Sequence, residues 1–121
     1  MIVTKNTDVE ARKIRTVEGL STHGEISMKP LMVGDQMVLL EAHYPPGAGA
    51  PLHIHQHETV CYVVRGKVKV TVGEESFTLG PGDCCRHPKD VPHGIESIED
   101  ALVLEIKSPA QDISQFLGMS A

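Results

Sequence analysis

The sequence predicts an all-β fold, a small barrel or sandwich built from short strands. Eleven glycines and eight prolines separate short runs of β-branched and aliphatic residues. Residues 67–72 alternate Lys, Lys and Thr with three valines, which is the period of a strand with one face in water. Short strands between Gly and Pro turns are typical of sandwiches and barrels. At 121 residues, the chain is expected to form one domain over residues 1–121.

The strands follow one another with little else between them. They are expected at residues 9–15, 24–29, 37–44, 52–55, 59–65, 67–72, 76–79, 83–87, 94–98 and 101–107. Proline donates no ladder hydrogen bond, so Pro30 is expected at the edge or end of its strand. Gly66 is expected to form a tight turn between the two runs around it. Near the C-terminus, Asp112 can cap a short helical tail that Gly118 would stop.

Charge and cysteine content exclude several classes of partner. The net charge is −5 and the eleven Lys and Arg residues are scattered, which argues against nucleic acid. No apolar run reaches the length of a membrane span or of a signal-peptide core. The three cysteines are odd in number, with Cys84 and Cys85 adjacent, so no disulfide framework is indicated. We therefore expect a cytoplasmic protein with no nucleic-acid or membrane partner.

Histidines are the most informative residues of the chain. There are seven, and three of them alternate at His53, His55 and His57. On one strand, His53 and His55 would project to the same side, about 7 Å apart. His93 follows the turn-rich stretch at residues 80–83. Imidazoles in this pattern suit a bound metal ion, although a strand that carries two ordinary polar residues would show the same alternation.

The spacing of these residues resembles the two-motif signature of the cupin superfamily. Gly47 precedes His53 by six positions, and Gly66 follows position 59 by seven. In the second motif, Gly82 is followed by Pro88 and then by His93. The resemblance covers about residues 37–107 and implies a small β-barrel or double-stranded jelly roll. It also implies that His53, His55 and His93 bind one divalent transition metal inside the barrel. Imidazole ligands suit Zn, Fe and Ni and, less well, Mn.

The chain departs from that signature at one metal position. Cupins usually have glutamate where this sequence has Thr59, and Glu58 lies one residue earlier, on the opposite face of a strand. A threonine hydroxyl is a poor ligand, so three imidazoles plus water are expected, which is an open site. Asp90 also replaces a usual glycine, and Ser97 a frequent asparagine.

Besides Thr59, four further residues are candidates for the pocket. His57 either faces inward, where it could compensate for Thr59, or lies on a solvated loop. Cys61 either lines the cavity or is a small buried hydrophobe. Arg86 could anchor an anionic substrate. Glu105 interrupts an apolar run, so it lies either at an edge in water or inside a polar pocket, where a carboxylate could act as a general base.

Among cupins, the chain looks most like the small single-domain proteins of pectin and alginate degradation. The run from His53 to Gly66 and the ending from Glu105 to Pro109 carry this likeness. It implies proton transfer on an unsaturated uronate or a related small sugar acid, with Glu105 as the catalytic residue. One alternative is a three-histidine Fe(II) dioxygenase, because the site has no carboxylate ligand and so resembles that branch of cupins. The other is a cupin that binds a metal or small ligand without catalysis.

The strand around residue 62 also predicts a homodimer. Val60, Tyr62 and Val64 lie on the face opposite Thr59 and Cys61. Both faces are therefore apolar, and a single small barrel can cover only one of them. A second copy of the chain packed on the outer face is the expected solution.

Overall fold

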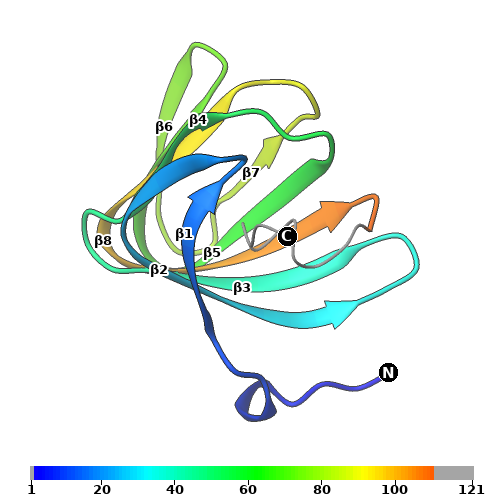
Figure 1. Cartoon of the computed structure of the whole chain (residues 1–121). Helices are drawn as coiled ribbons and strands as arrows, with labels where there is room; N and C mark the ends of the chain where they lie inside the picture. Colours follow the sequence, from blue (N-terminus) through cyan, green and yellow to red (C-terminus); the bar gives the residue numbers. More distant parts are fainter. Residues whose placement is uncertain (1, 111–121) are drawn as a thin grey trace.

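The fold consists of strands joined by tight turns (Figure 1). The computed structural model describes residues 2–110. Its elements are η1 (Asn6–Asp8), β1 (Arg12–Val17), β2 (Leu20–Val33), β3 (Val38–Tyr44), β4 (Gly49–His53), β5 (Glu58–Val72), β6 (Glu75–Leu79), β7 (Cys84–His87) and β8 (His93–Ser108). Residues 2–110 contain no α-helix and no helix able to cross a membrane. The predicted helical tail, at residues 112–118, lies outside the described residues.

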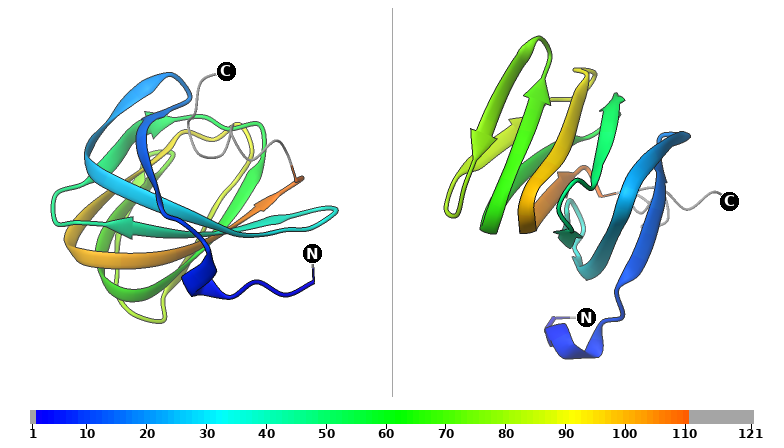
Figure 2. Two further views of the ribbon diagram at one scale, coloured as in Figure 1. Left: turned by 60° about the horizontal axis from the view of Figure 1, so that its bottom comes forward. Right: turned by 90° about the vertical axis from the view of Figure 1, so that its left-hand side faces the viewer.

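All eight strands belong to one antiparallel sheet. The order along it is β1-β2-β3-β8-β5-β6, while β4 pairs with both β2 and β8, and β7 pairs with β5. Because of these extra pairings, the sheet curls around a single interior, as the two views in Figure 2 show. The long strand β8 runs through the centre and contacts β3, β4 and β5. The predicted all-β barrel is therefore confirmed.

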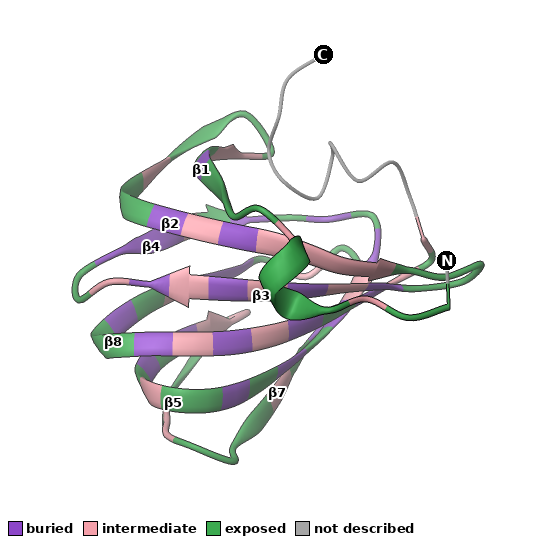
Figure 3. Cartoon of the chain, turned by 90° about the horizontal axis from the view of Figure 1, so that it is seen from below, coloured by how far each residue is buried: buried purple, intermediate pink, exposed green. Residues whose placement is uncertain are grey.

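Strict alternation of side chains builds the interior. In β3 and in the second half of β8, every other residue is buried, and the bands of colour in Figure 3 follow this period. Strands with one buried face show this pattern because successive side chains point to opposite sides. The buried apolar residues on the inner face include Ile14, Ile26, Met28, Val38, Leu40, Ala42, Val63, Val68, Val70 and Val103.

Three strands, β2, β5 and β8, are longer than the sequence predicts, because the bends within them resemble breaks in the sequence. Gly66 forms no hairpin turn: β5 continues through it, and β8 continues from His93 to Ser108. Gly66 has a φ of 87°, and a Cβ there would overlap the carbonyl oxygen of Asp100. The glycine therefore permits a close approach of two strands at a shift in their register.

Pro30 is a second residue at which the sequence predicts a strand end that the structure does not have. It lies inside β2, which pairs with β1 and β3, and the register of the β2–β3 pair shifts between Pro30 and Met32. A bulge tolerates proline because the ladder is already interrupted there. The prediction that Pro30 would limit its strand to an edge or end is wrong for this reason.

Candidate functional site

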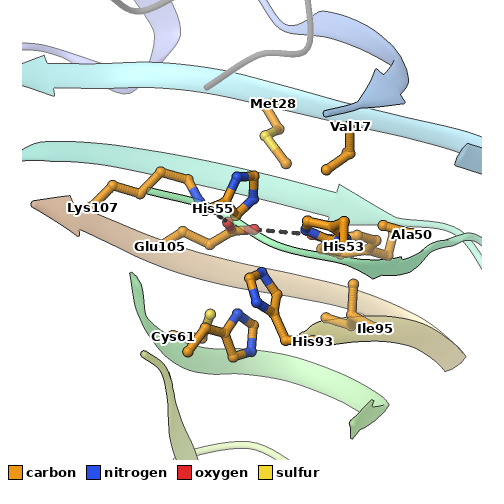
Figure 4. A pocket seen from close by; sticks show the side chains of 12 residues that line it. Val17, Met28, Ala50, His53, His55, Cys61, His93, Ile95, Glu105 and Lys107 are labelled. Atoms are coloured by element: carbon orange, nitrogen blue, oxygen red, sulfur yellow. Dashed lines mark hydrogen bonds and ion pairs between the residues drawn. The ribbon is translucent and has the colours of Figure 1, made fainter. Parts of the chain in front are cut away.

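Three histidines meet inside the barrel. His53 ends β4 and His93 begins β8, and these two residues are direct partners in the β4–β8 register. His55 lies in the connection after β4 rather than on the strand, which corrects the predicted strand at residues 52–55. One ligand nitrogen from each ring lies within 4.8 Å of the others. Figure 4 shows the three rings converging on one pocket.

The loop that carries His55 is fixed by Asp90. The Asp90 backbone N–H donates to the carbonyl of His55 at 3.1 Å, and its side chain accepts from Gln56 at 2.9 Å. Asp90 has a φ of 64°, in the left-handed region that glycine adopts freely and that Asp tolerates better than most residues. The replacement of the usual glycine by Asp90 therefore keeps the backbone shape and adds a side-chain contact.

Each ring is oriented by an acceptor on its Nδ1 atom. His53 Nδ1 lies 2.6 Å from the carbonyl of Pro51, and His93 Nδ1 lies 3.1 Å from the carbonyl of Val91. His55 Nδ1 lies 2.7 Å from a carboxylate oxygen of Glu18, in the turn between β1 and β2. Carbonyl and carboxylate oxygens only accept, so each Nδ1 carries the proton and each neutral ring leaves Nε2 as a lone-pair donor. This is the arrangement that metal-binding histidines use, so the residues present fit a metal ion.

The environment keeps these rings neutral. Burial lowers the pKa of His53, and it lowers the pKa of His55 to about 2 and of His93 to about 3. The Lys107 ammonium adds to the effect on His55. A group that does not bind a proton near neutral pH offers its lone pair to a metal without competition.

A buried carboxylate lies beside the histidines. Glu105 accepts from the Tyr44 hydroxyl at 2.9 Å and pairs with the Lys107 ammonium at 3.3 Å. Burial alone would raise the pKa of Glu105, but the Lys107 charge and the Tyr44 hydrogen bond outweigh it and lower that pKa. Burial raises the pKa of Tyr44, and the neighbouring Glu105 charge raises it further. Glu105 therefore lies inside the pocket as an ionised carboxylate, not at an edge in water.

Thr59 is on the inner face and contacts the ammonium group of Lys107. Its side chain is 1% exposed, and its hydroxyl accepts from Lys107 Nζ at 3.1 Å. Glu58 points to the outside, as its position on β5 predicts, and pairs there with Arg86 at 2.9 Å. Arg86 is thus an exposed residue of the outer wall, and the expectation that it lies in the pocket is wrong.

Two other candidates are buried. His57 stacks on His55 with ring centroids 4.3 Å apart, and burial lowers its pKa to about 4. It therefore faces inward, against the reading as a solvated loop residue, although it does not line the pocket itself. Cys61 lies on the pocket wall. Its thiol hydrogen bond to Cys85 lowers the pKa of Cys85 to about 5 and raises that of Cys61.

Sequence reasoning missed three neighbours of the histidines. Lys107 could have been found, because it shares the period-2 face of Glu105 on β8. Tyr44 gave a weaker signal, since it only ends a strand. Glu18 gave none, because its contact with His55 joins residues 37 positions apart.

The pocket is small. Its cavity has a volume of about 40 Å³ and is lined by Val17, Met28, Tyr44, Ala50, His53, His55, Cys61, His87, His93, Ile95, Glu105 and Lys107. At about 10–15 Å³ for each water-sized centre, the cavity has room for a few groups of that size.

Comparison with known proteins matches these features to relatives. The chain is 30% identical over 80 residues to the pectin degradation protein KdgF of Dickeya dadantii, an alignment that covers 65% of this chain and 73% of that protein. It is 28% identical over 81 residues to oxalate decarboxylase OxdC of Bacillus subtilis, which covers 63% of this chain but only 21% of that protein. The chain thus spans about a fifth of the length of OxdC.

Solved structures share the fold. KdgF from a Halomonas species has a TM-score of 0.80 and 25% identity, with 92% of this chain and 97% of that chain covered. An RmlC-like cupin from Shewanella frigidimarina has a TM-score of 0.82 and 23% identity, with 93% and 95% covered. A family model described as a cupin domain matches residues 40–107, which is more than half of the sequence. The chain therefore belongs to the cupin domain family.

Proposed function

We propose that His53, His55 and His93 hold one divalent transition metal ion. The support is the shared orientation of the three rings, each with its Nδ1 proton donated to an oxygen and its Nε2 left available. When bound, such an ion polarises a hydroxyl or carbonyl oxygen of a substrate. The Thr59 hydroxyl is not counted as a ligand, because it accepts a hydrogen bond from Lys107. The protein ligands in this proposal are the three imidazoles.

We infer further that the protein catalyses proton transfer on a small sugar acid, with an unsaturated uronate as the proposed substrate. The observation that carries this proposal is Glu105, a carboxylate that is only 6% exposed and is kept ionised beside the three histidine rings. An ionised carboxylate accepts a proton, and burial removes the water that would compete for it. The likeness to the pectin degradation protein KdgF supports the class of substrate.

Each charged residue of the pocket has a defined role in this proposal. Glu105 accepts the proton of the anomeric hydroxyl. The bond between the anomeric carbon and the ring oxygen then breaks, and the electrons of that bond move to the ring oxygen. A proton returned to the far carbon of the double bond completes the linear keto acid, so the product is an isomer of the substrate. Lys107 attracts the carboxylate of the substrate, and Tyr44 holds Glu105 in place through its hydrogen bond.

The test uses protein loaded with Zn, Mn or Ni and a 4,5-unsaturated uronate. Opening of the ring followed by ketonisation removes the conjugated double bond, so the loss of its ultraviolet absorbance gives the rate. We expect Glu105→Gln to lower the catalysed rate by about 10²-fold or more. Glu58→Gln is the matched control, because Glu58 is a carboxylate on the outer wall that pairs with Arg86.

Two results would count against the proposed reaction. One is a rate in Glu105→Gln equal to that of the unchanged protein. The other is a metal-loaded protein that does not exceed the spontaneous reaction. Oxygen consumption by the iron-loaded protein with a thiol or diketone would instead favour the dioxygenase alternative.

We propose that the protein forms a homodimer through the outer face of β5 and β8. Val60, Tyr62 and Val64 are exposed there, and Ile106 lies directly opposite Val60 in the register. Tyr62 is 44% exposed in the isolated chain, and aromatic residues are enriched at such interfaces. Sedimentation should show a dimer that Tyr62→Lys dissociates and that Leu52→Lys, at an exposed leucine of β4, leaves intact. A monomer for the unchanged protein would contradict this.

A cytoplasmic location is also a proposal. The three cysteines are free thiols, two of them adjacent in sequence. Free thiols persist in reducing compartments, whereas oxidising ones favour disulfides. Fractionation of native cells followed by immunodetection tests this, and recovery with secreted proteins would contradict it.

A further inference from the structure

A second group of metal-ligating side chains lies in the barrel wall beside the histidine pocket. Cys61 is on β5, and Cys85 is its direct partner on β7. His87 lies two residues after Cys85 on the same face of β7. Cys61 and His87 are buried and Cys85 is half-buried. The antiparallel register therefore places two thiols and an imidazole together on the inner side of one strand pair.

The three ligand atoms are close enough for one ion. The two sulfur atoms and one imidazole nitrogen all lie within 4.8 Å of one another, and Cys85 Sγ lies 3.5 Å from His87 Nε2. With Zn–S near 2.3 Å and Zn–N near 2.0–2.1 Å, the ligand atoms of a tetrahedral site lie about 3.5–3.8 Å apart. The separation between Cys85 Sγ and His87 Nε2 already matches these values, and the other two separations lie within 4.8 Å.

This group shares no ligand with the three-histidine set, and its chemistry differs. Two thiolates with one imidazole prefer soft or borderline ions such as Zn²⁺ or Cd²⁺, whereas three imidazoles accept a broader range. His87 does contact the first set, because its ring stacks on His93 with centroids 4.2 Å apart. The two sets are therefore neighbours, each with its own ligands.

We propose that Cys61, Cys85 and His87 form a second metal site, selective for Zn²⁺, in the wall of the cupin barrel. Three protein ligands leave the fourth tetrahedral position to water. Because Cys61 and His87 also line the histidine pocket, an ion here would lie in the wall of that pocket, with its charge balanced by the two thiolates. This site does not depend on the proposed proton transfer and can be tested without measuring turnover.

The test follows cadmium, which reports thiolate ligation through an ultraviolet charge-transfer band. The full chain titrated with Cd²⁺ should develop this band, and excess Zn²⁺ should remove it. Cys85→Ser should abolish the band, and Cys85→Ala should do the same. Cys84→Ser is the matched control, because Cys84 is the adjacent cysteine and is exposed on the outer wall. His53→Ala, which removes a ligand of the first site alone, should keep the band.

The contrary results are equally specific. The proposal fails if the unchanged protein shows no band, if Cys85→Ser and Cys85→Ala retain it, or if Cys84→Ser loses it to the same extent. Loss of the band in His53→Ala would also overturn it, because one shared site would then explain all binding. Circular dichroism of each variant verifies that the barrel is folded. Zinc should also slow the reaction of Cys85 with a thiol reagent while Cys84 still reacts, and equal reaction of both would count against the site.

Discussion

Removal of the Glu18 carboxylate should weaken metal binding without touching a ligand. Glu18 accepts from His55 Nδ1 at 2.7 Å and so holds the ring with Nε2 toward the pocket. Loss of such an outer partner typically lowers metal affinity 10–100-fold. The Glu18 side chain is 48% exposed, so water can replace part of the contact. For Glu18→Ala we therefore expect the low end, about tenfold, which corresponds to about 1.4 kcal/mol of binding free energy.

Calorimetric titration with Ni²⁺ measures this effect, in a Cys85→Ser background so that only the histidine site is counted. The affinity of Glu18→Gln for the metal should fall between that of the unchanged protein and that of Glu18→Ala, because its amide oxygen still accepts the hydrogen bond but carries no charge. Glu25→Ala is the control, since Glu25 is an exposed carboxylate on β2 that pairs with Lys13 outside the pocket. An affinity in Glu18→Ala within twofold of the unchanged protein would refute the idea that Glu18 orients His55.

Three further predictions concern charge, pH and backbone. Lys107→Met leaves the buried Glu105 carboxylate without its cation, so the acid limb of the rate profile of uronate conversion should move to higher pH; an unmoved limb would contradict the pairing. Burial lowers the pKa of His57 to about 4 and keeps it neutral in the folded metal-free protein, whereas the unfolded chain gains protons below about 6.5. The free energy of unfolding should therefore fall as the pH drops from 6.5 toward 4, and His57→Gln should flatten this fall in urea titrations; an equal slope would contradict it. Gly66→Ala should lower the melting temperature more than Gly82→Ala, because both residues have a φ of 87° but only the Cβ at Gly66 would meet backbone, at Asp100; equal losses would argue against the close approach.

The grouping of the histidines in the candidate site could be predicted from the sequence, because the residues of each motif are close together in the chain. His53 and His93 are direct partners across β4 and β8, which places them together once the barrel closes. The resemblance of both motifs to the cupin signature implies this meeting without knowledge of the long-range register. His55 reaches the same pocket even though it lies in a loop, because Asp90 ties that loop to the segment before β8. The prediction was thus right about the grouping and wrong about the strand that was expected to carry it.

The remaining features depend on long-range register, which one sequence does not show. Gly66 is suited equally to a turn and to a close crossing of strands, and only the position of β8 decides between them. Arg86 was expected inside because it leads toward His93, but the β5–β7 pairing turns it outward to meet Glu58. Lys107 shares the period-2 face of Glu105 in the sequence, but only the pairing of β8 with β5 brings its ammonium to Thr59.

Anomalous diffraction from a crystal grown with a transition metal would locate the ion and its protein ligands. We predict a peak in the pocket within about 2.0–2.2 Å of the Nε2 atoms of His53, His55 and His93. Each Nδ1 should remain on its oxygen acceptor when the ion is bound. A crystal in which this position stays empty at saturating metal, or in which one of the three rings points away from the ion, would contradict it.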